Sequence, residues 1–434
     1  MTPTTRSEQS GARPPATLPG GGPGRLAAGA GAAAAPAPAA NRRHRLGFWL
    51  VAYAFTVTMA FSAVPTPLYV LYQARDGFGP FTLTVIFAVY AAGVALSLLL
   101  AGHVSDWLGR RRVLVPAILV NVLAGVIFLA WPTVPGLLIA RFVSGISIGM
   151  LTATATAHLT ELHLAARPGA SRSRADVVAT AANLGGIGLG PLVSGLLAQY
   201  APDPLHLPFY VVEGFMLVGV LAMALVPETV RRSGPRPAYR PQRVSVPPAA
   251  RPAFLAASGA GAVVFAMFGL FTSLAPSFLA GSLHDASHAL AGLTAFLAFG
   301  ASAVSQILLA RSPLRRQFRL GFAVLALGIV AVTTAIWATS LPLLLIGGAL
   351  AGAGAGGVFK GSVSTVINLA PAETRGEALA GLFLASYLGL AIPVVGLGIA
   401  TQYLPSRVAL LIFSGALLAG LATVARRLLR PSAG

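Results

Sequence analysis

Three charged side chains lie inside long apolar stretches of this chain, where they could bind an anion or gain and lose a proton. They are Arg141, Glu213 and Lys360. A charge within hydrocarbon costs about 2.5–3.5 kcal/mol on insertion scales, so each needs a partner or a cavity. Arg141 and Glu213 lie at similar depths in their segments, which predicts an ion pair between them. The alternative for Arg141 and Lys360 is that their long side chains reach the lipid headgroups.

Lys360 is the only lysine among the 30 basic residues, and it follows Gly348, Gly352 and Gly356 at four-residue spacing. Small residues at this spacing form a helix face that another backbone can approach closely. We therefore expect Lys360 near a protein-facing surface, where it could bind an anionic compound or titrate.

A short polar run between two apolar stretches holds a second group of charges. Its glycines and charged residues are Gly102, Asp106, Gly109, Arg110, Arg111 and Arg112. The two glycines permit a tight turn and a close approach of the flanking helices. Asp106 is expected to accept backbone N–H groups near a helix N-terminus, and the arginines to pair with carboxylates or lipid phosphates. The plainer interpretation is that the arginines only anchor the loop on one side of a membrane.

A third pattern lies in one apolar segment, as Gly186, Gly190, Pro191 and Gly195 in the order G-x-x-x-G-P-x-x-S-G. A Gly-Pro pair bends a membrane helix, and the glycines permit close packing. The same reasoning predicts kinks at Pro65 and Pro67, and at Pro276.

The motifs of several enzyme classes are missing. The chain has no cysteine, no G-x-x-x-x-G-K-[ST] phosphate loop and no H-E-x-x-H zinc motif. His158 and Glu161 are three residues apart and share a helix face, but a metal site needs more ligands. We expect a polar cap there. The sequence predicts that the protein is not an enzyme and uses no cofactor or metal.

Composition places the chain in a membrane. The 434 residues are 56% hydrophobic and 9% charged, and the mean hydropathy is +0.79. Soluble proteins carry about 25% charged residues, so the outer surface must face lipid. The net charge of +19 comes from arginines clustered at segment ends, which sets membrane orientation. No basic patch with interleaved aromatic residues indicates a nucleic-acid partner.

Hydropathy predicts an all-α membrane protein with twelve transmembrane helices in two six-helix bundles. The predicted helices are 46–72, 81–102, 113–131, 137–160, 177–199, 208–227, 253–279, 288–310, 320–338, 341–366, 377–400 and 408–425. The predicted regions are a disordered cytoplasmic tail (1–45), an N-terminal bundle (46–228), a cytoplasmic linker (229–252), a C-terminal bundle (253–425) and a short cytoplasmic tail (426–434). With both termini inside, 26 of the 30 basic residues fall on the cytoplasmic side, as the positive-inside rule requires.

Several of these motifs resemble those of the major facilitator superfamily. The loop from Gly102 resembles the family's G-x-x-x-D-x-x-G-R-R signature, with Trp107 in place of the usual basic residue. The run that begins at Arg141 resembles the fourth-helix R-x-x-x-G pattern, whose arginine is implicated in proton coupling. The run ending at Gly195 resembles the antiporter motif G-P-x-x-G-G, with Ser194 at the first of its paired glycines. In these motifs the chain is most similar to drug–proton antiporters.

The resemblance implies a secondary active transporter that works by alternating access, with a substrate site between two bundles. We expect a monomer in the cell membrane, in contact with lipids, that exports a small amphipathic or drug-like compound in exchange for protons. The first helix has no carboxylate, unlike many such antiporters, so coupling would use Glu213, Lys360 or the loop acids. One alternative is uptake or symport of a small organic anion steered by Arg141 and Lys360. Another is a membrane sensor or scaffold that transports nothing.

Overall fold

The computed structural model describes residues 38–430, apart from residue 103 and the segments 231–238, 283–286 and 372–373. The described residues form helices and connecting turns without a strand. Eleven helical segments are long and apolar enough to cross a membrane, and a twelfth, Leu207–Met223, is apolar but shorter, with 17 residues. The predicted all-helical class is therefore confirmed.

The first half contains the elements up to residue 223. They are α1 (Pro38–Ala63), α2 (Tyr69–Asp76), α3 (Pro80–Ala101), α4 (Ser105–Leu108), α5 (Arg110–Ala130), α6 (Val134–Ala166), α7 (Ser173–Thr180), the π-helical turn η1 (Ala181–Gly185), α8 (Gly186–Tyr200) and α9 (Leu207–Met223). The segment from α7 through η1 to α8 is continuous and forms one span.

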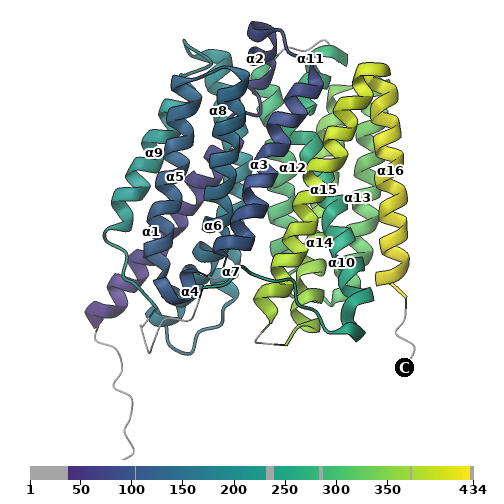
Figure 1. The fold of residues 1–434 in the computed structure, drawn as a ribbon. Coiled ribbons are helices and arrows are strands. Elements are labelled where there is room, and N and C mark those ends of the chain that lie inside the picture. The colour runs from purple at the N-terminus through teal and green to yellow at the C-terminus, as the bar shows by residue number, and fades with distance from the viewer. Residues whose placement is uncertain (1–37, 103, 231–238, 283–286, 372–373, 431–434) are drawn as a thin grey trace, which may run out of the picture. The chain divides into compact units, whose positions relative to one another are not determined.

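The second half begins after the linker. Its elements are the 3₁₀ turn η2 (Pro248–Ala250), α10 (Arg251–Ser273), α11 (Ala275–Ser282), α12 (His288–Leu309), α13 (Leu314–Trp337), α14 (Leu341–Leu369), α15 (Arg375–Tyr403) and α16 (Ser406–Leu428). Within residues 38–430, Figure 1 shows α4 near one end of the long helices and α2 and α11 near the other. We call the end with α4 and Arg110 the arginine-rich end, and the other the opposite end.

Proline positions account for the breaks in two helices. The first predicted helix divides at Val64–Leu68 into α1 and α2, because Pro65 and Pro67 each lack the N–H that a helix needs. The seventh divides next to Pro276 into α10 and α11. These predicted kinks are confirmed.

Most helix boundaries differ from the prediction; among them, α6 ends at Ala166 rather than at 160, and α13 begins at Leu314 rather than at 320. α1 begins at Pro38, so residues 38–45, which the sequence assigned to the tail, are helical. The rest of the predicted tail lies outside the described residues. α9 ends at Met223 rather than at 227, because Pro227 has no N–H and cannot continue the helix. The Pro227 carbonyl instead accepts a hydrogen bond from the His158 side chain of α6.

Contacts between helices divide the chain into two groups with a narrow set of connections. α6 packs on α1, α3 and α5, and α14 packs on α10, α12 and α13. The two groups meet mainly through two helix pairs, α8 with α12 and α3 with α15. This is the two-bundle arrangement predicted from the sequence.

Glycines bring the paired helices of the two halves into backbone contact at the opposite end. A Cβ atom at Gly195 of α8 would lie 2.4 Å from the carbonyl oxygen of His288 in α12. One at Gly292 would lie 2.2 Å from the Pro191 carbonyl oxygen, and one at Gly398 of α15 would lie 2.2 Å from the Thr84 hydroxyl of α3. Only glycine fits such contacts, so the two halves are tightly joined at this end.

The described part of the linker connects the halves at the arginine-rich end. The backbone N–H of Gln242 donates to the Leu99 carbonyl at 2.8 Å, and the Tyr239 hydroxyl donates to the Leu100 carbonyl at 3.0 Å. Val244 then packs against Gly381 of α15. The linker therefore contacts α3 in one half and α15 in the other.

Candidate functional site

Arg110 is the centre of a charged network at the arginine-rich end. Its Nη1 lies 2.5 Å from Asp106 Oδ1 and 2.8 Å from Ser105 Oγ, while Nη2 lies 2.8 Å from Glu161 Oε1 in α6. The guanidinium thus binds Asp106 in the loop and Glu161 in α6, and so connects the loop to α6. The Asp106 side chain is 64% exposed and that of Glu161 is 34% exposed, so the Glu161 contact is the better shielded from solvent and salt.

Glu228 caps the start of α5. Its Oε1 accepts the backbone N–H of Arg110 at 2.9 Å, and its Oε2 accepts that of Arg111 at 3.1 Å. These are orphan donors at the start of α5, and a carboxylate there also interacts favourably with the helix dipole. Asp106 lies in the first turn of α4, near a helix N-terminus as expected, but its carboxylate pairs with the Arg110 side chain rather than with backbone N–H groups. Nothing in the local sequence pointed to Glu228, which is 118 positions from Arg110.

Gly109 is needed for this arrangement. Its φ of +114° is a conformation that side-chain-bearing residues rarely adopt. A Cβ there would also lie 2.6 Å from Glu228 Oε2. Gly102, at the other end of the loop, faces the linker, where a Cβ would lie 2.7 Å from Gln242 Oε1. The predicted tight turn is present at Gly109, whereas the close contact at Gly102 is with the linker and not with a flanking helix.

The other two loop arginines make no ion pair with the described residues. Arg112 is exposed and Arg111 is partly exposed. The corresponding turn of the second half is built without an ion pair in the described part of the chain. There the buried Gln317 side chain donates to the carbonyls of Leu309 and Ser312, at 3.1 and 2.9 Å. Ion pairs of Arg110 thus stabilise the turn in the first half, and hydrogen bonds of Gln317 stabilise the equivalent turn in the second half.

Arg141 is buried, with 1% of its surface exposed, and its contacts differ from those predicted. Nε donates to the Tyr69 hydroxyl and Nη1 to the Ser62 carbonyl, each at 2.6 Å. The guanidinium carbon also lies 5.4 Å from the centre of the Tyr69 ring and 5.5 Å from that of Tyr90, within the range of cation–π attraction. The break between α1 and α2 supplies two of these partners. Arg141 therefore does not reach the headgroups.

Glu213 is not paired with Arg141 in this structure. No ion pair or hydrogen bond of the Glu213 carboxylate is found among the described residues. The side chain is 8% exposed and packs on α5, where a Cβ at Gly125 would lie 2.9 Å from its Oε2. Similar depth in the membrane did not make the two residues neighbours, since depth fixes one coordinate and leaves the position around the bundle open.

Lys360 lies in the second half and is partly exposed. The glycine face before it packs on α12 as expected: a Cβ at Gly352 would meet the Ala298 carbonyl at 1.9 Å, and one at Gly356 the Ser302 carbonyl at 2.4 Å. Arg141, Glu213 and Lys360 are on α6, α9 and α14, and no contact joins any two of them among the described residues.

An aromatic cluster in the second half includes Phe359, the residue before Lys360, and was missed by the sequence analysis. We use this name for Phe265, Phe359, Phe383 and Tyr387, which come from α10, α14 and α15. Ring centres of Phe265 lie 5.3 Å from Phe359 and 5.2 Å from Tyr387, and Phe359 lies 5.8 Å from Phe383. All four are partly exposed. The residues are up to 122 positions apart (387 − 265), so their grouping has no local signal.

Tyr90 lies beside Arg141 in the first half. Its ring centre is 5.5 Å from the Arg141 guanidinium carbon. Tyr90 is on α3 and Tyr387 of the aromatic cluster is on α15, and these helices form one of the two pairs that join the halves. Each helix of this pair therefore carries an aromatic residue of one of the two groups described here.

The Gly-Pro segment packs helices closely both within the first half and between the halves. A Cβ at Gly186 would lie 2.6 Å from the Thr56 carbonyl of α1, and one at Gly190 would lie 2.0 Å from the Ala60 carbonyl. Gly195 faces α12 instead. The helical irregularity is the π turn at Ala181–Gly185, which precedes Pro191. The segment thus combines a packing face with a local widening of the helix.

Comparison with known proteins identifies the family. Residues 46–333 match the sequence model of the Major Facilitator Superfamily. The chain belongs to the major facilitator superfamily. This is a family of transporters, so the expected partner is a small molecule. No curated protein matches the sequence.

Solved structures of other superfamily members share the fold. The human organic anion transporter MFSD10 has 17% identity and a TM-score of 0.65, with 88% of this chain and 99% of that chain covered. A POT family transporter in complex with 5-aminolevulinic acid has 12% identity and a TM-score of 0.71, with 90% and 97% covered. A mutant of the nucleoside transporter NupG has 13% identity and a TM-score of 0.66, with 89% and 100% covered. At these identities the likeness concerns the fold alone.

Proposed function

We propose that this chain exports a small amphipathic compound across the cell membrane by alternating access, in exchange for protons. The observation that carries the proposal is the aromatic cluster, whose Tyr387 lies on α15, a helix that contacts the first half, and whose Phe359 precedes Lys360 in α14. Partly exposed rings offer an apolar surface to a ligand, and one convergent charged group orients it. A site at the interface of two bundles is also where rocking of one bundle against the other changes access.

The contacts between the halves support alternating access. At the opposite end the halves touch through glycines, as at Gly195 and Gly398. At the arginine-rich end they are connected by the linker, while the Arg110 network lies within the first half. Because these contacts between the halves involve no covalent bond or ion pair, the two halves can move apart there as rigid units. In this proposal the glycine contacts close the opposite end and open when the substrate is released there.

We assign proton coupling to Glu213 and Lys360. Glu213 is a buried carboxyl without a basic partner in the described residues, and Lys360 is a partly exposed amine on α14. Either group could change charge when the halves move. We place both termini and the arginine-rich end in the cytoplasm, because the positive-inside rule favours that side for 26 of the 30 basic residues.

Proton flux in proteoliposomes tests this function. The purified chain is reconstituted with an entrapped pH indicator, a pH gradient is imposed, and a panel of amphipathic cations, neutral compounds and organic anions is added one at a time. We expect at least one amphipathic compound to move protons in the direction opposite to its own movement. Vesicles without protein and vesicles with Lys360→Ala serve as controls.

The same assay separates the alternatives. Inward accumulation of an organic anion that fails in Lys360→Ala would replace export by anion uptake, a function favoured by the cationic Lys360 and Arg141. Absence of flux for every compound, together with co-purifying partner proteins, would replace transport by a sensor or scaffold role.

A further inference from the structure

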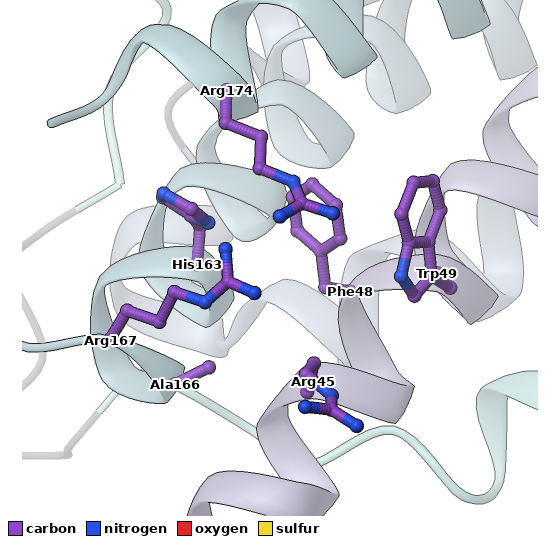
Figure 2. A pocket seen from close by; sticks show the side chains of 7 residues that line it. All are labelled: Arg45, Phe48, Trp49, His163, Ala166, Arg167 and Arg174. Atoms are coloured by element: carbon purple, nitrogen blue, oxygen red, sulfur yellow. The ribbon is translucent and has the colours of Figure 1, made fainter. Parts of the chain in front are cut away.

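A hollow at the arginine-rich end of the first half is lined by cationic and aromatic side chains. It is a shallow hollow between α1, the end of α6 and the start of α7. The lining residues are Arg45, Phe48, Trp49, His163, Ala166, Arg167 and Arg174. Figure 2 shows Arg167 and Arg174 extending from α6 and α7 toward the side of the hollow formed by Phe48. The hollow is separate from the Arg110 network and from the aromatic cluster.

The positive charge of this hollow is unbalanced. Three of its seven lining residues are arginines, and none is acidic. Arg45, Arg167 and Arg174 are exposed and take part in no ion pair among the described residues. Guanidinium groups bind phosphate oxygens through paired N–H donors. An anion with several oxygens would therefore relieve the mutual repulsion of the three side chains.

Contacts within the hollow hold its walls in place. The ring Nε2–H of His163 donates to the Ser171 carbonyl at 3.2 Å, which joins α6 to the turn before α7. The Phe48 and His163 rings are 5.8 Å apart, and the Arg174 guanidinium carbon lies 5.7 Å from the centre of the Trp49 ring. The three helix segments are thus connected even without a ligand.

Neighbouring apolar residues favour a lipid over a free anion. Trp49 is 49% exposed and Leu46 is 53% exposed, and both lie on the apolar span of α1. Residues three apart share a helix face, so Leu46 and Trp49 form an exposed apolar strip beside the hollow. Tryptophan is enriched at the boundary between headgroups and acyl chains. The hollow therefore lies at headgroup depth with an apolar surface beside it.

We propose that this hollow binds the phosphate headgroup of an anionic phospholipid, whose acyl chains lie along Leu46 and Trp49. Arg45, Arg167 and Arg174 supply the donors, and the Trp49 ring lies against the Arg174 guanidinium. A bound lipid connects α1 to the α6–α7 turn, so the occupancy of the hollow stabilises the first half. Because this proposal concerns a lipid at the periphery, it does not depend on the compound that is transported.

Quenching of Trp49 fluorescence by brominated lipids tests the proposal. The chain has four tryptophans, at positions 49, 107, 131 and 337, and replacing the other three by Phe leaves Trp49 as the only reporter. The full chain is reconstituted in phosphatidylcholine vesicles, and brominated phosphatidylglycerol or brominated phosphatidylcholine is titrated. We expect brominated phosphatidylglycerol to quench Trp49 at a much lower lipid fraction than brominated phosphatidylcholine.

A matched pair of variants separates the hollow from general surface charge. R45Q/R167Q/R174Q removes three charges from the hollow, whereas R315Q/R316Q/R319Q removes three exposed charges from the start of α13. A basic residue near an anionic membrane contributes about 1 kcal/mol, which is about a fivefold change in affinity. The first variant should therefore lose about 100-fold in affinity for phosphatidylglycerol, as measured at Trp49. The second should leave the quenching of Trp49 nearly unchanged, because its three arginines lie in the other half and do not line the hollow.

Three results would overturn the proposal. They are equal quenching by the two lipids, equal losses in both triple variants, or displacement of brominated phosphatidylglycerol by millimolar inorganic phosphate, which would assign the hollow to a free anion. Size-exclusion profiles establish that each variant is folded. If the triple variant does not fold, the single variants R45Q and R174Q replace it, and each should lose about fivefold.

Discussion

Arg141 Nε donates a hydrogen bond of 2.6 Å to the hydroxyl of Tyr69, a residue 72 positions away in the sequence. The bond joins the start of α2, next to the break after α1, to α6. Arg141 thus pairs with Tyr69 and not with Glu213, the partner that the sequence predicted. A buried guanidinium that loses an acceptor costs about 1–3 kcal/mol. Tyr69→Phe keeps the aromatic ring and removes only the hydroxyl, so it isolates the contribution of this hydrogen bond.

We therefore predict that Tyr69→Phe lowers the free energy of unfolding by about 1–3 kcal/mol, while Glu213→Gln leaves it unchanged or slightly higher. The glutamine is uncharged and similar in size to a carboxylate that has no partner among the described residues. Thermal unfolding of the purified variants in one detergent measures both effects. The account of Arg141 is wrong if Glu213→Gln is the more destabilising of the two.

Gly109→Ala adds only one methyl group but should destabilise the loop strongly. The alanine would have to adopt a φ of +114° and place its Cβ 2.6 Å from Glu228 Oε2. Such backbone strain costs about 1–3 kcal/mol, and the displaced carboxylate would also lose the N–H groups of Arg110 and Arg111. Thermal unfolding of Gly109→Ala measures the loss. Gly214→Ala is the control, because nothing lies within 4 Å of its Cβ position, and an equal loss there would contradict the prediction.

The two carboxylates that bind Arg110 should differ in importance. Glu161→Gln should weaken the connection between the loop and α6 more than Asp106→Asn does, because Asp106 is the more exposed partner. Exposed ion pairs contribute only about 0.2–1 kcal/mol and are screened by salt. Unfolding temperatures at low and high salt provide the comparison. A larger decrease in the unfolding temperature for Asp106→Asn than for Glu161→Gln would contradict the predicted order. So would a wild-type salt dependence that disappears only in Glu161→Gln, because salt should screen the more exposed pair with Asp106.

Gly195 should control how tightly the halves close at the opposite end. In Gly195→Ala the new Cβ meets the His288 carbonyl at 2.4 Å, so α8 and α12 must separate. We expect a loss of stability of about 1–3 kcal/mol and greater labelling of cysteines introduced near this contact. Gly185→Ala, on the same continuous span, has open space at its Cβ and should show neither effect. Similar labelling in both variants would mean that the contact does not hold the halves together.

The sequence predicted the spans and kinks because these depend on local patterns. Long apolar runs determine which segments cross the membrane, and Pro65, Pro67 and Pro276 mark where helices divide. The early start of α1 was missed because the residues from Pro38 to Arg45 are too polar to resemble a membrane helix, although their backbone is helical.

Side-chain partners could not be predicted in the same way. The cap of α5 by Glu228, the contacts of Arg141 and the aromatic cluster each join residues that are distant in sequence. Glu228 was predicted to lie at the edge of the linker, and only the return of the chain after α9 brings it beside Gly109. Depth in the membrane can be read from a segment, but the rotation of a helix about its axis depends on all of its neighbours.

Distances between spin labels at the two ends of the helices test the central claim, that the halves move against each other during transport. The chain has no cysteine, so exposed positions can be labelled in pairs. Tyr200→Cys with Tyr403→Cys reports on the opposite end, and Arg172→Cys with Leu308→Cys on the arginine-rich end. In proteoliposomes with a pH gradient and a transported compound, we predict that the first distance lengthens as the second shortens. Distances that stay fixed, or that lengthen together, while flux proceeds would contradict alternating access by these two halves.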